Sequence, residues 1–356
     1  MTASLSVPAL NSAIALTLGD AAGIGPEIIA KCFVDHPQHM GGCFVAGDVQ
    51  AMRTAASLLA APGRPALPVA VIDQPADVWA VPPHCIPVLQ VGAPLQPVVL
   101  GQVSAVAGEF AGRCVQWAAD AALRGEIAAL VTAPLHKEAL SAAGAPYDQF
   151  PGHTEMLQAA ASKYLGKAVD QVPVRMMLAN DELRTVLVSI HMSLREALAA
   201  VTYDNVLQTI LITHAALTAA LGRVPRIAVA GLNPHAGEGG LFGREEIEVI
   251  APAIAAARAK GCDVSGPWAP DTVFMRARHT AAKAGEFDVV VAQYHDQGLI
   301  PVKYLGVEKG VNVTLGLPLV RTSPDHGTAF DIAGSGHADA SSLLEAVRMA
   351  RSLITA

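Results

Sequence analysis

The chain has 356 residues, of which 52% are apolar and 4% aromatic, and its formal net charge at pH 7 is −7. Because a nucleic-acid-binding surface needs a basic stripe, an acidic chain without a Lys/Arg cluster argues against a nucleic-acid partner. The sequence shows no basic leader, no uninterrupted apolar span and no CxxC pair among five scattered cysteines. We therefore expect a cytoplasmic protein with reduced thiols and no membrane partner.

Short apolar runs rich in Val, Ile and Ala alternate with Ala-rich stretches along the chain. The runs that predict strands are 13–18, 43–46, 69–72, 128–132, 174–178, 185–190, 227–230, 289–292 and 311–315. The stretches that predict helices are 26–33, 49–59, 103–123, 206–220, 244–259, 271–282 and 341–354. This alternation predicts an α/β fold with mostly parallel sheets flanked by helices.

Two loops that follow predicted strands have the composition of ligand loops. Residues 19–27 (GDAAGIGPE) join a strand to a helix, and Pro26 suits the first helical turn. The segment is not GxGxxG, so a structural turn is as consistent with it as a ligand loop. Residues 131–137 (VTAPLHK) follow another predicted strand and could face a ligand or form a solvated loop.

The segment FPGHTE, at residues 150–155, precedes a further helix. Thr154 is expected as its N-cap, which would leave backbone N–H groups available to an anion. His153 would add a donor beside them. Simple helix capping is the alternative.

Three of the predicted strands lead into histidines, namely His191, His235 and His295. Ligands of open α/β sheets bind outside the carboxyl ends of the strands, so these imidazoles could meet at one edge. Together they would form a divalent-metal site with positions open to substrate. Their spacings of 44 and 60 residues form no local ligand motif, so structural roles stay open.

Two cations are embedded in apolar sequence near the C-terminus. Lys303 lies in LIPVKYLG, and Arg321 lies in VTLGLPLVRTS. Such charges are paired or bind a ligand, and phosphate or carboxylate suits an Arg–Lys pair. Internal salt bridges are the alternative. The polar loop at residues 323–336 offers the acceptors that a ribose and an adenine would need, or serves as a structural loop.

Taken together, GDAAGIGPE, VTAPLHKEAL, PGHTE, NPHAGEGG, YHDQG and RTSPDHGTAFDIAG resemble one family over residues 19–338. It is the NAD-dependent 4-hydroxythreonine-4-phosphate dehydrogenase family of pyridoxal phosphate (vitamin B6) biosynthesis. The resemblance implies a two-domain fold similar to isocitrate and isopropylmalate dehydrogenases, with the active site in the interdomain cleft. Residues 1–134 and 316–356 would form an NAD-side α/β domain, and 135–315 a metal, substrate and dimerisation domain.

The resemblance also implies a homodimer whose active sites use residues from both chains, and it assigns site residues. The family's metal ligands fall on His191, His235 and His295. Its substrate and phosphate contacts fall on His153, Thr154, Lys303, Asn312 and Arg321. The candidates for catalytic proton transfer are Asp271, Asp296 and Lys303. The NAD-facing loop matches His326, Gly327, Asp331 and Gly334.

The implied reaction is oxidation of 4-phosphohydroxy-L-threonine by NAD⁺ and decarboxylation to 3-amino-2-oxopropyl phosphate. Zn²⁺ suits three imidazoles, while Mg²⁺, Mn²⁺ and Co²⁺ are alternatives. Ala21 in place of Pro, the insert at 147–149 and a longer segment at 276–284 leave the substrate open. D-threonate or D-erythronate 4-phosphate is the alternative, and an aromatic dihydrodiol is less favoured because Lys303 and Arg321 are retained. The alternatives from other classes are a protein that binds a phosphorylated metabolite without turnover and a structural zinc protein.

Overall fold

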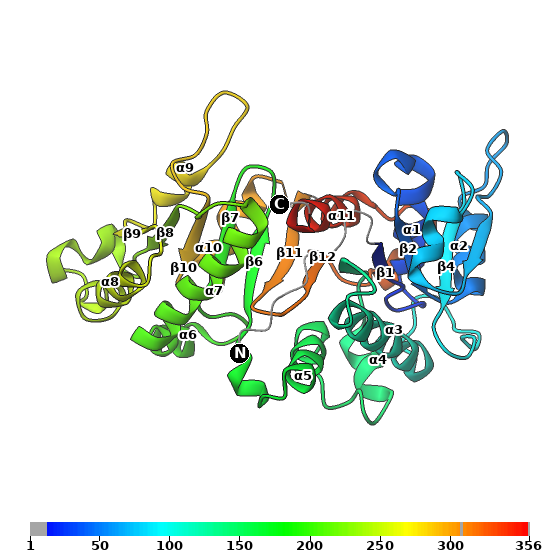
Figure 1. Cartoon of the computed structure of the whole chain (residues 1–356), viewed down its shortest axis with the longest axis horizontal. Coiled ribbons are helices and arrows are strands. Elements are labelled where there is room, and N and C mark those ends of the chain that lie inside the picture. Colours follow the sequence, from blue (N-terminus) through cyan, green and yellow to red (C-terminus); the bar gives the residue numbers. More distant parts are fainter. Residues whose placement is uncertain (1–12, 307–308, 355–356) are drawn as a thin grey trace. The chain divides into compact units, whose positions relative to one another are not determined.

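The computed structural model describes residues 13–306 and 309–354 of the chain (Figure 1). The chain divides into two compact units. The first runs up to Pro173 and resumes at Leu317, and the second is Val174–Gly316. In both units strands alternate with helices, which confirms the predicted α/β class.

The strands of the first unit are parallel throughout. Their order is β3 (Val69–Ile72), β4 (Ile86–Gln90), β2 (Cys43–Gly47), β1 (Ile14–Thr17), β5 (Ala129–Thr132) and β12 (Val320–Pro324). Every residue of β1, β2 and β5 is buried, which is typical of parallel strands covered by helices on both faces.

The helices of the first unit are α1 (Gly25–Asp35), α2 (Val49–Leu58), α3 (Ala105–Leu123), α4 (Lys137–Ala142), α5 (His153–Leu165) and α11 (Ser341–Ile354). Pro26 lies in the first turn of α1, as predicted. Asp48 caps α2 by accepting the N–H of Ala51 at 2.8 Å. In α3, a Cβ on Gly108 would lie 2.0 Å from the carbonyl oxygen of Ala139, so only glycine lets α3 and α4 pack this closely.

The strands of the second unit include one reversal. Their order is β11 (Val311–Leu315), β6 (Arg175–Ala179), β7 (Arg184–Leu187), β10 (Val289–Ala292), β8 (Ile227–Ala230) and β9 (Val264–Trp268). β6 is antiparallel to both β11 and β7, whereas β7, β10, β8 and β9 run parallel. The three strands that precede the candidate histidines, β7, β10 and β8, are therefore parallel neighbours, and their carboxyl ends share one edge.

The helices of the second unit flank these strands (Figure 1). They are α6 (Leu194–Ala200), α7 (Tyr203–Leu221), α8 (Ala251–Ala259), α9 (Val273–Ala277) and α10 (His295–Tyr304). A π-helical turn, Glu246–Ile250, leads directly into α8. The core between strands and helices is built from small and branched side chains such as Leu187, Val290 and Leu299. None of the helices in residues 13–306 and 309–354 combines the length and apolar character that a membrane crossing needs.

Several elements differ from the sequence prediction. The predicted helix at 271–282 is only the five residues of α9, and the one at 244–259 begins with the π-helical turn. The strands β4, β9 and β12 and the helices α4, α6 and α10 were not predicted. The three strands were missed because each contains a proline, and proline interrupts an apolar strand pattern.

The sequence predicts a domain boundary near residue 134, but the first unit continues to Pro173 and so includes residues 135–173. The structure assigns this segment, with α4 and α5, to the first unit. The reason is packing on α3: Gly108 lies against Ala139 of α4, and Gly112 lies against the ring of Tyr147. The chain returns to the first unit at Leu317.

Candidate functional site

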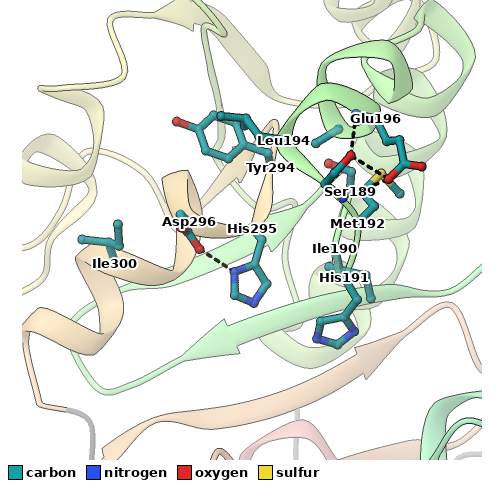
Figure 2. A pocket seen from close by; sticks show the side chains of 12 residues that line it. Ser189, Ile190, His191, Met192, Leu194, Glu196, Tyr294, His295, Asp296 and Ile300 are labelled. Atoms are coloured by element: carbon teal, nitrogen blue, oxygen red, sulfur yellow. Dashed lines mark hydrogen bonds and ion pairs between the residues drawn. The ribbon is translucent and has the colours of Figure 1, made fainter.

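Two of the candidate histidines meet in the second unit (Figure 2). His191 follows β7 by four residues, and His295 is the first residue of α10, three residues after the end of β10. Because β7 and β10 are adjacent and parallel, their ends bring the two rings together. The ring centroids are 5.7 Å apart, and the ring planes make an angle of 46°. This spacing allows one nitrogen of each ring to approach a common ligand.

Asp296 orients the ring of His295. Its Oδ1 lies 2.7 Å from the Nδ1 of His295. An ionised Asp296 accepts the Nδ1–H, so Nε2 is left to present its lone pair to a metal or a substrate. A carboxylate behind a histidine is the usual way in which proteins fix the tautomer of a metal-binding imidazole.

A cavity of about 840 Å³ opens beside these two rings. Its wall comes from the segment between β7 and α6 and from the start of α10. Figure 2 shows His191, His295 and Asp296 on this wall together with apolar side chains. Among those, Leu194 is 59% and Ile300 is 62% exposed. The wall of the cavity thus combines polar and apolar side chains.

His235 has a different setting. It lies in the turn Pro234–Gly240 that follows β8, and its ring faces Phe242 with 6.2 Å between centroids. Among residues 13–306 and 309–354, no three His, Cys, Asp or Glu side chains form a group that could hold a metal ion. The structure of this chain therefore brings two of the three predicted imidazoles together, and the three-histidine set stays a prediction.

Two glutamines tie the histidine-bearing loops to one another. Gln293 donates from Nε2 to the carbonyl of Ala230 at 2.7 Å, and its own backbone carbonyl accepts the hydroxyl of Ser189 at 3.0 Å. Gln297 donates from Nε2 to the carbonyl of Gly231 at 2.8 Å. The ends of β7, β10 and β8 are thus cross-linked by these hydrogen bonds. Sequence reasoning missed both residues, although Gln293 ends an apolar run and is fully buried.

A second candidate group lies in the first unit, around Arg321. This arginine is on β12 and is 4% exposed. Its Nε and Nη2 donate to the hydroxyl of Thr132, at 3.2 and 2.8 Å. Burial lowers the pKa of Arg321 to about 10, so the guanidinium stays charged at neutral pH. The carboxylate of Glu155 also acts electrostatically on Arg321, and a buried guanidinium of this kind can bind an anionic ligand as well.

His153 lies close enough to Arg321 for the two to interact electrostatically. Burial, and then the charge of Arg321, hold the pKa of His153 well below 6.5, so the ring is neutral. Its Nε2 is buried without a hydrogen-bond partner among the described residues. Since native proteins rarely leave such an atom unsatisfied, it marks a place for a polar ligand.

The expected N-cap role of Thr154 is wrong. The helix α5 begins at His153, and Gly152, in an extended conformation, is its N-cap. Thr154 therefore lies inside the first turn. The first backbone N–H groups of α5 still have no acceptor within the helix, so the anion-binding capacity that motivated the prediction remains.

Three of the other predicted site residues, Lys303, Asn312 and Asp271, lie in the second unit. Lys303 is on α10 and Asn312 is on β11, both in the second unit and both half-buried. Asp271 is exposed just before α9. The five predicted substrate contacts thus divide between the units, three in the first and two in the second.

The predicted NAD-facing loop lies against the glycine-rich loop of residues 19–27. The N–H of Ile24 donates to the carbonyl of Thr328 at 3.0 Å, and the ring of His136 stacks on Phe330 with 4.6 Å between centroids. A Cβ on Gly23 would lie 2.8 Å from that same carbonyl oxygen. The residues proposed to face NAD lie around this junction, and they are His326, Gly327, Asp331 and Gly334.

Comparison with known proteins finds relatives over nearly the whole chain. A family model described as pyridoxal phosphate biosynthetic protein PdxA matches residues 39–350. The 4-hydroxythreonine-4-phosphate dehydrogenase of Beijerinckia indica is 52% identical over 337 residues, covering 94% of this chain and 93% of that protein. The D-threonate 4-phosphate dehydrogenase of Pectobacterium atrosepticum is 44% identical over 348 residues, covering 97% and 100%. The crystal structure of 4-hydroxythreonine-4-phosphate dehydrogenase from Klebsiella pneumoniae superposes with a TM-score of 0.83 at 41% identity, covering 97% of this chain and 100% of that one.

Proposed function

The chain belongs to the PdxA family of pyridoxal phosphate biosynthetic proteins, and from that premise we propose that it is an NAD-dependent, metal-assisted dehydrogenase. Its substrate is 4-phosphohydroxy-L-threonine, and its products are 3-amino-2-oxopropyl phosphate, CO₂ and NADH. The observation that carries the proposal is the pair His191 and His295, brought together over a cavity with Asp296 behind one ring.

The imidazole side chains at this site are of a type that binds a divalent cation. His191 and His295 would hold it, and His235 would be the third ligand; imidazoles suit Zn²⁺, and Mg²⁺, Mn²⁺ or Co²⁺ are alternatives. When bound, such a cation would lower the pKa of the substrate hydroxyl and polarise the carbonyl that replaces it. Asp296 fixes the ring of His295 through their hydrogen bond, so its main role would be to orient that ring.

We also propose that the active enzyme is a homodimer in which a second copy completes the ligand set. A single chain brings only two of the three imidazoles together within its described residues. The cavity beside them is rimmed by exposed apolar side chains, including Met192, Leu194 and Ile300. Such a rim is typical of a surface that another protein covers.

The remaining residues bind and orient the substrate. Five residues would hold the phosphate and the other polar groups of the substrate, namely Arg321, His153, Thr154, Lys303 and Asn312. This binding would place the C3 hydrogen of the substrate against the nicotinamide of NAD⁺. The hydride passes from C3 to NAD⁺ while the hydroxyl proton goes to a base. The resulting 3-keto acid then loses CO₂, and the carbon that carried the carboxylate takes up a proton in its place. Lys303 and water are candidates for the base, and Asp271 and Asp296 are candidates for a proton relay, because carboxylates near a cation stay ionised.

NADH formation from a panel of 4-phosphorylated hydroxy acids, with and without a chelator, tests this function. We expect turnover of 4-phosphohydroxy-L-threonine that a chelator abolishes and Zn²⁺ or another divalent cation restores. Turnover of D-threonate 4-phosphate alone would favour the second candidate, which rests on the 44% identical relative of that name. Binding of these compounds without any NADH would contradict an enzymatic role.

A further inference from the structure

The turn that carries His235 has an unusual backbone. Five consecutive residues, 235–239, have φ angles between 42° and 81°, in the left-handed region. Three of them, His235, Ala236 and Glu238, have side chains that disfavour this conformation. A run of this kind persists only where the surrounding structure holds it, so the contacts around the turn decide where His235 points.

The carboxylate of Glu246 accepts hydrogen bonds from the segment that precedes this turn. Glu246 is 3% exposed and opens the π-helical turn before α8. Its Oε1 accepts the N–H groups of Leu232 and Asn233, each at 2.7 Å. Its Oε2 accepts the side-chain amide of Asn233 at 3.0 Å. Three N–H donors from two consecutive residues thus converge on one buried carboxylate.

Two glycines let the loop close around that carboxylate. A Cβ on Gly231 would lie 3.1 Å from Oε1 of Glu246, and a Cβ on Gly237 would lie 2.7 Å from Oε2. Glu246 therefore contacts the loop both before and within the left-handed run. On the other side, Gln297 of α10 donates to the carbonyl of Gly231. The His235 turn is held between Glu246 and the helix that begins with His295.

We infer that Glu246 is a positioning residue for His235: its buried carboxylate fixes the left-handed turn that aims this imidazole. The inference rests on the proposed function, because it takes His235 to be a metal ligand. It goes beyond that function by assigning a role to a residue for which the proposed function names no contact with substrate or cofactor.

The test compares Glu246→Gln with Glu248→Gln. Glutamine keeps the shape of Glu246, but it removes the charge and places a donor against the amide of Asn233. Glu248 is on the same helical segment, and its side chain is 58% exposed and paired with Arg244. Hydrogen exchange of the metal-free protein and calorimetric titration with Zn²⁺ are measured for both variants. A His235→Ala variant is included to show the effect of losing the ligand itself.

For Glu246→Gln we expect amide exchange at Leu232 and Asn233 to be about tenfold faster and Zn²⁺ affinity to fall about tenfold. Exchange elsewhere and the melting temperature should stay close to those of Glu248→Gln. His235→Ala should lose Zn²⁺ affinity without changing exchange at these two amides. This combination separates positioning of the ligand from the ligand's own contribution.

Unchanged exchange at Leu232 and Asn233, or unchanged Zn²⁺ affinity, in Glu246→Gln would overturn the inference. Faster exchange throughout the second unit, with a much lower melting temperature, would also overturn it, because Glu246 would then stabilise the fold in general. If the wild-type protein binds no Zn²⁺, the proposed function fails, whereas the exchange rates still decide whether Glu246 holds the turn.

Discussion

The Nε2 of His153 is buried without a hydrogen-bond partner among the described residues, and burial and the charge of Arg321 both disfavour protonation of the ring. Its pKa in the folded protein lies well below 6.5, so as the pH falls through about 6.5 the unfolded chain takes up a proton that the folded protein does not. Stability is therefore lost on the acid side. The sequence indicated a donor at this position but not its burial, which depends on the packing of α5 against other elements of the first unit.

We predict that His153→Asn reduces the acid sensitivity of the fold. The melting temperature of the wild-type protein should fall between about pH 7.5 and about pH 5.5, and that of the variant should fall less, because the depressed titration is gone. Thermal scans at both pH values measure this. His84→Asn is the matched control, since His84 is exposed and asparagine tolerates its φ of 60°. Equal slopes for wild type and His153→Asn would contradict the prediction.

Thr132 shows how a small side chain can support a charged one. Its hydroxyl accepts two N–H groups of Arg321, and Thr132→Val removes that acceptor at nearly constant volume. Because hydrogen bonds to charged groups contribute about 1.5–3 kcal/mol, we expect the KM for the phosphorylated substrate to rise at least tenfold. The KM for NAD⁺ should change little. Steady-state kinetics with each substrate varied in turn measure both constants.

The control for that experiment is Thr322→Val, at the residue that follows Arg321 on β12. The hydroxyl of Thr322 donates to the carbonyl of Ala346 in α11, and strand alternation directs it to the face opposite Arg321. This variant should lose stability while keeping its KM for the phosphorylated substrate. Equal KM values for the two variants would show that Thr132 does not support substrate binding.

At the scale of elements, the sequence predicted best where a run of β-branched residues is unbroken. β8, β10 and β11 have the predicted bounds, and the alternation with helices follows from them. β4, β9 and β12 were missed because Pro87, Pro267 and Pro324 interrupt or end their apolar patterns. α10 was missed because Gly298 and Pro301 lie within it, and only packing against the strands makes it helical.

The close approach of α3 and α4 makes Gly108 a sensitive position. Alanine is intrinsically better than glycine inside a helix by about 1 kcal/mol, yet its Cβ would lie 2.0 Å from a backbone oxygen. We expect Gly108→Ala to lower the free energy of unfolding by about 1–3 kcal/mol, as overpacking does. Denaturant titration measures this. Gly41→Ala is the control, because a Cβ added there would meet no atom of the described residues within 4 Å, and its effect should be within about 0.5 kcal/mol.

For the whole molecule, the sequence located the loops that carry the candidate site residues but not every contact among those residues. The parallel neighbours β7, β10 and β8 bring the histidine-bearing loops to one edge, as strand order in an α/β fold requires. The position of His235 beside Phe242 depends on a left-handed turn and on Glu246, and no periodicity in the sequence signals either. The resemblance to a known family supplied the roles that the residue pattern alone left open.

We predict that the protein is a dimer in solution and that a charge on the cavity rim dissociates it. Leu194 is 59% exposed beside the cavity, so Leu194→Glu places a carboxylate in the proposed contact. Size-exclusion chromatography with light scattering should report a monomer without metal-dependent turnover. Val71→Glu, at a residue of the first unit that is 54% exposed, should remain dimeric and active. A fully active Leu194→Glu monomer would contradict a shared ligand set.

The antiparallel pairing of β6 with β11 has a consequence for the ancestry and the engineering of this chain. Arg175 is opposite Leu315, so the polypeptide departs from the first unit and comes back to it at adjoining points. Genetic insertion of one folding module into a loop of another leaves this signature, since it needs the guest's ends to be close. Residues 174–316, which include all three histidines, therefore form a segment with neighbouring ends that is suited to transplantation or circular permutation.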